Sequence, residues 1–116
     1  AGMGTGGTIT GNSSKLKEEY PGIKIIGVQP KEGQIIEGLR SLKSFVPAVV
    51  NLTMVDKVIE LDSEKALEAR KYLAVNKGIL AGPSSGAAFF VAKEIAQKNP
   101  GATIVTIFPD RGERYL

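Results

Sequence analysis

Three short runs rich in β-branched residues recur along the chain, separated by stretches with helical patterning. The runs are residues 23–28 ("IKIIGV"), 55–61 ("VDKVIEL") and 103–108 ("TIVTIF"). Apolar runs of this length are typical of buried strands in parallel sheets. Parallel strands that alternate with helices are joined by crossover connections, which are almost always right-handed. The pattern therefore predicts an α/β fold built on a parallel sheet.

Helical stretches fill the intervals between these runs. The first spans residues 9–20 and stops at Pro21 and Gly22. The second begins after an N-cap at Asp62 and Ser63 and ends at Lys77 and Gly78, and the third follows the turn "GILAGPSSG". Residues 31–51 are compatible with a short helix, although glycines and a proline interrupt any long period. The apolar stripes expected to face the core are Ala66, Leu67, Ala69, Leu73 and Ala74 in the second helix, and Ala87, Ala88, Val91, Ala92, Ile95 and Ala96 in the third.

The composition narrows the classes of function. The 116 residues fit one domain, and 42% of them are hydrophobic, as in globular proteins. The chain has no cysteine and no histidine, so it lacks disulfides and the commonest metal ligands, and we expect no metal site. The net charge of +3 comes from scattered residues, which does not favour a nucleic-acid partner. No apolar run approaches the roughly 20 residues of a membrane span, so we expect a cytoplasmic protein without a membrane partner.

The chain starts almost on a glycine-rich loop, "AGMGTGGTITG", without an initiator methionine. In α/β proteins such a loop leaves the end of a strand. We therefore expect a fragment of a longer protein, with residues 1–116 forming part of one α/β domain.

Three interpretations of this loop compete. A flexible turn is the simplest. Gly2, Gly4 and Gly7 also match the dinucleotide fingerprint G-x-G-x-x-G, but Gln29 and Pro30 stand where that motif needs an acidic residue. The third interpretation is a phosphate cup, formed by the backbone N–H groups of residues 2–8 and of the helix that follows. Side chains would keep the backbone away from a phosphate, which explains their absence.

Several segments, taken in order, resemble one enzyme family. The string "GTGGT" at residues 4–8 resembles the phosphate loop of the pyridoxal-phosphate enzymes of the tryptophan-synthase-β fold type. "GILAGPSSGAA" resembles the turn whose serine bonds the pyridine nitrogen, and "NPGATIVTIFPDRGERYL" resembles the C-terminal segment of cysteine synthases. Within these, "EGLRSLKSFVPAVVNLTMVDKV" and "DRGERYL" are most similar to the B (M-type) branch of the O-acetylserine sulfhydrylases. The resemblance covers essentially the whole chain and implies an open, twisted parallel sheet with helices on both faces.

The resemblance assigns roles to individual residues. The cofactor phosphate would be held by Gly4, Thr5, Gly6, Gly7 and Thr8. Ser84 would hydrogen-bond the pyridine nitrogen, although an isolated Ser-Ser pair more often caps a helix, and Ser85 can cap while Ser84 faces the ring. A neutral hydroxyl leaves the ring a weaker electron sink than a carboxylate would, which suits β-elimination and β-replacement.

Two further residues are implicated less directly. Arg40 lies in a segment that corresponds to the mouth of the family's active site, so it is a candidate for contacting the leaving group or carboxylate of an activated serine. An ordinary exposed arginine is the alternative. Asp110 follows the last expected strand and either orders the site or caps a loop.

The family's catalytic lysine has no counterpart here. The resemblance places the Schiff-base lysine, a ring-contacting asparagine and a Ser/Thr-Gly-Asn loop in an N-terminal portion that this chain lacks. None of the eleven lysines occupies a matching context, so we expect no catalytic residue in this chain and no activity from it alone.

The implied function is therefore that of a longer parent. Such an enzyme would bind pyridoxal 5'-phosphate, form a homodimer and convert O-acetyl-L-serine or O-phosphoserine to L-cysteine with sulfide or another sulfur donor. Cystathionine β-synthase and serine/threonine dehydratase share the fold and remain alternatives. A nicotinamide-dinucleotide-binding domain and a non-catalytic anion-binding module come from other classes.

Overall fold

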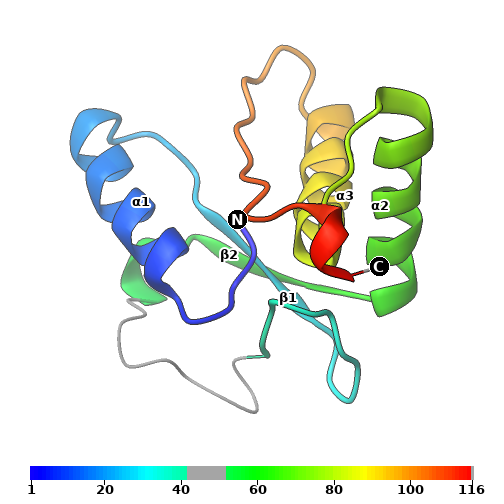
Figure 1. The fold of residues 1–116 in the computed structure, drawn as a ribbon. Coiled ribbons are helices and arrows are strands. Elements are labelled where there is room, and N and C mark those ends of the chain that lie inside the picture. Colours follow the sequence, from blue (N-terminus) through cyan, green and yellow to red (C-terminus); the bar gives the residue numbers. More distant parts are fainter. Residues whose placement is uncertain (42–51, 116) are drawn as a thin grey trace.

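The computed structural model describes residues 1–41 and 52–115 of the chain. Two parallel strands, β1 (Ile26–Pro30) and β2 (Lys57–Leu61), lie between three helices. The helices are α1 (Gly7–Glu19), α2 (Ser63–Lys77) and α3 (Pro83–Lys98), and two short 3-10 turns, η1 (Leu52–Met54) and η2 (Gly112–Tyr115), complete the order. In Figure 1, α1 lies on one side of the strands, and α2 and α3 lie side by side on the other.

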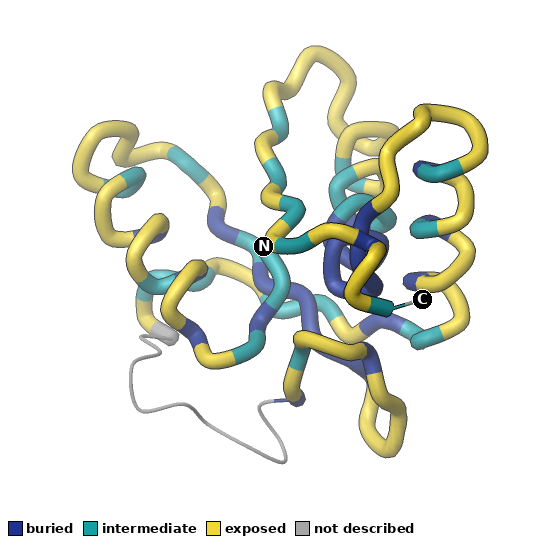
Figure 2. The backbone as a smooth tube through the Cα atoms, in the orientation of Figure 1, coloured by how far each residue is buried: buried dark blue, intermediate teal, exposed yellow. Residues whose placement is uncertain are grey.

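The sheet places the glycine-rich loop at its carboxyl edge. β1 pairs with β2 from Ile26 opposite Lys57 to Pro30 opposite Leu61. On the other side of β1, Gly2 forms a parallel bridge with Val28, because Met3 N–H donates to the Val28 carbonyl at 2.8 Å. The loop therefore leaves the end of a strand-like segment. Figure 2 shows that burial concentrates on these central segments and on the start of α3.

Two apolar clusters occupy opposite faces of the sheet. Val28 and Leu61 pack on one face against Ala66 of α2 and against Ala87 and Val91 of α3. The other face carries Met3, Ile9 and Ile25, with Leu16 of α1 and Val58 of β2 packed against them. Helices thus cover both faces of a parallel sheet, and the α/β expectation is confirmed.

The helix predictions hold within a few residues. Gly78, in the left-handed conformation at φ +67°, ends α2 as expected. Asp62 stands at the N-cap position, but its carboxylate accepts hydrogen bonds from Lys31 and Gln34 instead of capping the helix. The predictions that Leu67 and Ala96 face the core are wrong, because Leu67 is 53% exposed and Ala96 is also exposed.

The third strand is a correction to the sequence prediction. Residues 103–108 form no strand, and their backbone makes no hydrogen bond within the described part of the chain. A strand needs a neighbour about 4.8 Å away, and the described residues supply none to this run. Val105 is accordingly 84% exposed. The short helix considered within residues 31–51 is absent over residues 31–41, and residues 42–51 lie outside the described residues.

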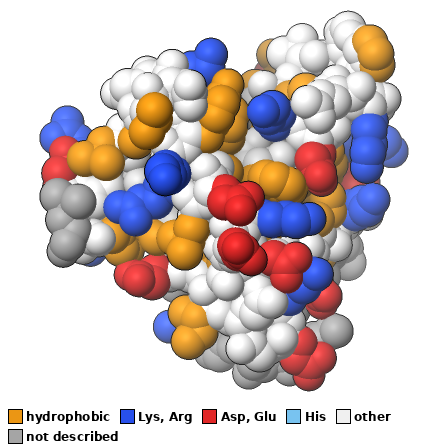
Figure 3. Space-filling view, turned by 90° about the vertical axis from the view of Figure 1, so that its right-hand side faces the viewer, with side chains coloured by type: hydrophobic (Ala, Val, Ile, Leu, Met, Phe, Trp, Pro, Cys, Tyr) orange, Lys and Arg blue, Asp and Glu red, His pale blue; other side chains and the backbone are white. Residues whose placement is uncertain are grey.

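The surface on the face that carries α2 mixes positively and negatively charged side chains. Figure 3 shows Lys and Arg intermixed with Asp and Glu there. Among the described helices, none is long and apolar enough to cross a membrane. Across residues 1–41 and 52–115, no cluster of carboxylates could hold a metal ion.

Candidate functional site

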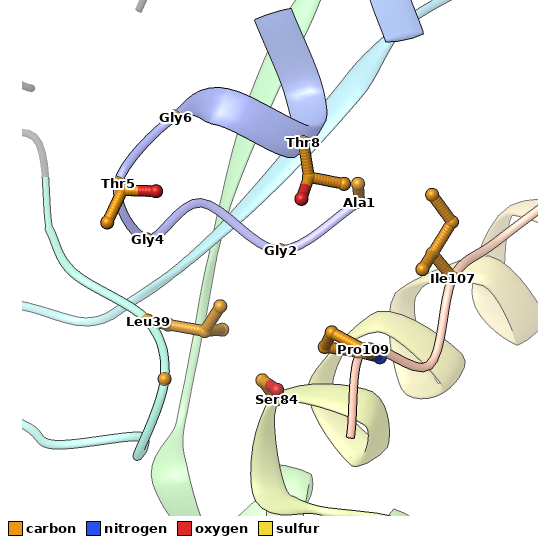
Figure 4. A pocket seen from close by; sticks show the side chains of 11 residues that line it. Ala1, Gly2, Gly4, Thr5, Gly6, Thr8, Leu39, Ser84, Ile107 and Pro109 are labelled. Atoms are coloured by element: carbon orange, nitrogen blue, oxygen red, sulfur yellow. The ribbon is translucent and has the colours of Figure 1, made fainter. Parts of the chain in front are cut away.

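A cavity of about 170 Å³ lies between the glycine-rich loop and the start of α3. Its walls come from four segments far apart in the sequence, and Figure 4 shows them converging on one space. The residues that line it are Ala1, Gly2, Gly4, Thr5, Gly6, Thr8, Gly38, Leu39, Ser84, Ile107 and Pro109. The loop and Ser84, predicted separately from two distant motifs, therefore share one cavity.

Close backbone contact explains the bare residues of the loop. A Cβ atom on Gly4 would lie 2.6 Å from the carbonyl oxygen of Gly38, closer than real Cβ contacts allow. Gly6 adopts φ +89°, a left-handed conformation that glycine reaches without steric cost, and it is the N-cap of α1. The loop is thus bare because it turns sharply and packs against a second backbone segment.

The amides of this loop are unsatisfied donors. The backbone N–H groups of residues 4–9 donate to no acceptor within the described part of the chain, and the first helical bond runs from Thr10 N–H to the Gly6 carbonyl at 3.0 Å. Free amides at a helix N-terminus form a site for anions, since the N–H groups and the helix dipole both favour negative charge. This geometry is the one that the phosphate-cup interpretation expects.

Hydroxyl groups add donors on both sides of the cavity. Figure 4 shows the Thr5 and Thr8 hydroxyls turned into the space enclosed by the loop, with Ser84 across from them. Ser84 is only 3% exposed and belongs to the first turn of α3. Among the described residues that line the cavity, no side chain carries a charge, so backbone dipoles and hydroxyls make up their polar contribution to the site.

The helix-cap interpretation of the serines is wrong. Gly82 is the N-cap of α3, Pro83 opens the helix, and Ser84 and Ser85 follow inside the first turn. Pro is favoured at the first helical position because it has no N–H to leave unsatisfied. Ser85 is fully buried, and its hydroxyl has no partner within the described residues.

The remaining candidates lie at the border of the cavity. Gly7 is exposed and opens α1, so its free amide belongs to the phosphate cup although the residue does not line the cavity. Arg40 follows Leu39 but is not among the lining residues, and its backbone N–H donates to the Met3 carbonyl at 2.8 Å. Asp110 follows Pro109 and accepts a hydrogen bond from the Tyr115 hydroxyl. That bond keeps the proton on the phenol and raises the pKa of Tyr115.

Six lining residues are not among the predicted site residues: Ala1 and Gly2, which directly precede the predicted part of the loop, and Gly38, Leu39, Ile107 and Pro109, which lie elsewhere in the sequence. Gly38 has φ +90°, and its conformation brings its carbonyl to Gly4. An isolated glycine in an unclassified stretch gives only a weak sign of such a contact, so the sequence alone marks it as a helix breaker.

Comparison with known proteins identifies the family. A family profile described as "Pyridoxal-phosphate dependent enzyme" matches residues 1–110. The chain belongs to this family. Its members use pyridoxal phosphate, so the dinucleotide interpretation of the glycine loop has no support left.

The individual relatives include cysteine synthases and an O-acetylserine-dependent cystathionine β-synthase. Cysteine synthase B of Salmonella typhimurium is 43% identical over 115 residues, covering 98% of this chain and 38% of the relative. The crystal structure of a cysteine synthase from Entamoeba histolytica superposes with a TM-score of 0.90 and 36% identity, covering 98% of this chain and 37% of that one. An O-acetylserine-dependent cystathionine β-synthase from Helicobacter pylori gives a TM-score of 0.90 and 37% identity, covering 99% and 40% of the two chains. The chain thus spans about two fifths of the length of each of these three proteins.

Proposed function

We propose that this chain is the C-terminal, cofactor-phosphate-binding part of a longer cysteine synthase, called the whole enzyme below. One observation carries the proposal: Gly4, Thr5, Gly6 and Thr8, whose amides donate to no acceptor among the described residues, line the same cavity as Ser84. A phosphate and an aromatic ring joined in one molecule need two such subsites. The similarity to cysteine synthases over nearly the full length of this chain supports the choice of enzyme.

The residues of this chain divide the work between the two ends of the cofactor. The amides of residues 4–9 and the hydroxyls of Thr5 and Thr8 would hold the phosphate through hydrogen bonds to a charged acceptor, which are about twice as strong as neutral ones. Ser84 would orient the ring through a hydrogen bond to its nitrogen. When bound, pyridoxal phosphate supplies an electron sink for β-replacement at an O-activated serine.

The other catalytic groups belong to the whole enzyme and not to this chain. We propose that the Schiff-base lysine and the substrate-carboxylate loop lie outside these 116 residues, and that the whole enzyme uses O-acetyl-L-serine or O-phosphoserine with a sulfur donor. The 37% identity to an O-acetylserine-dependent cystathionine β-synthase supports a second candidate, in which homocysteine is the acceptor.

The whole enzyme provides the test. Purified with pyridoxal phosphate, it should release cysteine from O-acetylserine and sulfide, and product analysis with sulfide or homocysteine as acceptor separates the two candidates. A whole enzyme that binds no pyridoxal phosphate would contradict both.

Two variants probe the two subsites. Thr8→Ala should speed release of the cofactor, whereas Ser84→Ala should lower turnover more than cofactor retention. Ser14→Ala, an exposed serine on α1, is the control and should change neither quantity.

A further inference from the structure

The C-terminal turn is fastened to the segment that leads into α3. Gly112 N–H donates to the Leu80 carbonyl at 3.0 Å, and Gly82 N–H donates to the Asp110 carbonyl at 3.3 Å. An antiparallel bridge between Ala81 and Arg111 lies between these two bonds. The backbone around residues 80–82 and 110–112 therefore forms one unit.

Two side chains of the turn close on the N-cap of α3. A Cβ atom on Gly82 would collide with Asp110 Oδ1 and would lie 2.7 Å from Tyr115 Cε2. Tyr115 donates its hydroxyl hydrogen to Asp110 Oδ2, which fixes the carboxylate in this position. The Asp110–Tyr115 pair thus occupies the space that any side chain at position 82 would need.

Arg70 of α2 fixes the same unit from another side. Its Nε donates to the Ala81 carbonyl at 2.8 Å, and its Nη2 donates to the Gly112 carbonyl at 3.2 Å. The guanidinium carbon lies 5.7 Å from the centre of the Tyr115 ring. One side chain therefore ties α2, the approach to α3 and the C-terminal turn together.

A contribution to fold stability alone does not explain why a carboxylate stands at position 110. Asp110 Oδ1 is buried and accepts no hydrogen bond within the described residues, an arrangement that costs free energy. The positive end of α3 offsets part of this cost. Asp110 also connects two parts of the site, because its neighbour Pro109 lines the cavity and Gly82, against which it packs, stands two residues before Ser84.

We propose that Asp110, held by Tyr115, is a positioning residue: it fixes the first turn of α3 and thereby sets where the Ser84 hydroxyl points in the cavity. This inference rests on the proposed function, in which Ser84 contacts the cofactor ring. Asp110 itself is not among the residues that line the cavity and acts through the helix start.

Amide hydrogen exchange tests the clamp without any cofactor. In the apo form of the whole enzyme, Asp110→Asn and Tyr115→Phe should each speed exchange of the amides of residues 86–88, the first bonded amides of α3, by about tenfold. Glu113→Gln and Tyr20→Phe make the same chemical changes at exposed positions and should leave that exchange unchanged. Exchange at the wild-type rate in both clamp variants would overturn the proposal. Should Asp110→Asn fail to fold, Tyr115→Phe still decides, because it keeps the ring against Gly82.

The holoenzyme tests whether the clamp acts through Ser84. Tyr115→Phe should shift the absorption band of bound pyridoxal phosphate in the same direction as Ser84→Ala, and should add little to that shift in the Ser84→Ala background. A shift of full size in that background would show that the clamp does not work through Ser84. If the wild-type enzyme bound no pyridoxal phosphate, the proposed function would fail, while the exchange experiment would still report on the clamp.

Discussion

Gly4 and Gly38 meet backbone to backbone at one wall of the cavity, although 34 positions separate them. This contact sets the distance between the phosphate cup and the segment that carries Leu39. A side chain at position 4 would meet a carbonyl oxygen that belongs to the backbone and cannot rotate away. The shape of the cavity therefore depends on the lack of a side chain at Gly4.

Gly4→Ala should therefore displace the loop and weaken cofactor binding. Since the affected hydrogen bonds go to a charged group, we expect a loss of about 1.5–3 kcal/mol, or ten- to a hundredfold in the dissociation constant. Equilibrium binding of pyridoxal phosphate to the whole enzyme measures it. Gly22→Ala is the matched control, because its Cβ would meet no atom within 4 Å. Equal affinities for the two variants would contradict the role of the contact.

Individual site residues were predictable only where a motif is contiguous. The loop at residues 4–8 and the turn around Ser84 each carry their pattern within a few positions, and the structure places both at the cavity. Pro109 and Gly38 line the same space, but tertiary contacts bring them there, and no local pattern marks them. The prediction that Ser85 caps α3 is wrong because Gly82 is the N-cap and Pro83 is the first helical residue, so the helix has already begun before the serines.

Among the elements, α2 and α3 lie in close backbone contact at Gly86. A Cβ atom there would collide with the Ala66 carbonyl oxygen and would lie 3.0 Å from Arg70 Cβ. The close approach keeps Arg70 within reach of the Ala81 carbonyl and so supports the start of α3.

Gly86→Ala should destabilise the fold although alanine is the better helix former. The gain in propensity is about 1 kcal/mol, whereas overpacking costs about 1–3 kcal/mol, and here the obstructing atom is backbone. Gly11→Ala is the control on α1, where a Cβ meets nothing within 4 Å, and should stabilise by about 0.5–1 kcal/mol. Urea unfolding of the whole enzyme gives both values, and the same sign for both variants would refute the packing argument.

Asp56 ties α1 and β1 together and makes the fold sensitive to acid. Its carboxylate accepts hydrogen bonds from Ile25 N–H at 2.7 Å and from Lys17 at 3.1 Å, and these bonds lower the pKa of Asp56. A lowered pKa in the folded state adds stability above the unfolded-state pKa of about 3.9, and this contribution is lost as the pH falls through the folded-state pKa.

Asp56→Asn should therefore flatten the acid side of the stability curve. Unfolding midpoints of the whole enzyme in urea, measured between about pH 2.5 and pH 6, should fall less steeply for the variant than for the wild type. Asp62→Asn, which removes a second carboxylate with a lowered pKa, should flatten the curve separately. Parallel curves for Asp56→Asn and the wild type would refute the assignment.

The α/β fold class could be predicted from the sequence because short apolar runs and helical stripes of apolar residues are local patterns, and the two kinds alternate along the chain. β1 and β2 appear near their predicted places, although β1 begins at Ile26, after Ile25 has bonded to Asp56. Residues 103–108 carry an equally strong strand pattern but form none. The residue types of a segment indicate only that it could form a strand. A strand also needs a neighbouring strand to hydrogen-bond with, and a local sequence pattern carries no information about that neighbour.

At the scale of the whole molecule, residues 103–108 are an apolar run that is partly exposed and has no strand partner among the described residues. Val105 is 84% exposed and lies in a segment without regular structure and without hydrogen-bonded neighbours within the described residues. Exposed apolar segments with unpaired backbone N–H and C=O groups can pair with other chains. The 116-residue chain taken alone should therefore self-associate.

Val105→Lys should reduce that self-association, because a charged side chain on an unpaired edge disfavours pairing. Light scattering of the isolated chain over a range of concentrations measures the mean mass. Val75→Lys places the same charge on α2, at a valine that is 73% exposed but whose backbone is helical, and should have little effect. An equal reduction by both variants would point to net charge instead of the edge.

The absence of charged side chains around the cavity has a consequence for how binding responds to acidity. Peptide groups and hydroxyls do not ionise across the neutral range, so the donors of the described loop and of Ser84 keep their dipoles there. Retention of the cofactor by these groups should then depend on the protonation of the cofactor alone, and should decline as the dianion of its phosphate ester takes up a proton at about pH 6. A protein that bound the same ester with histidine would gain positive charge over that interval, so its retention would instead pass through a maximum.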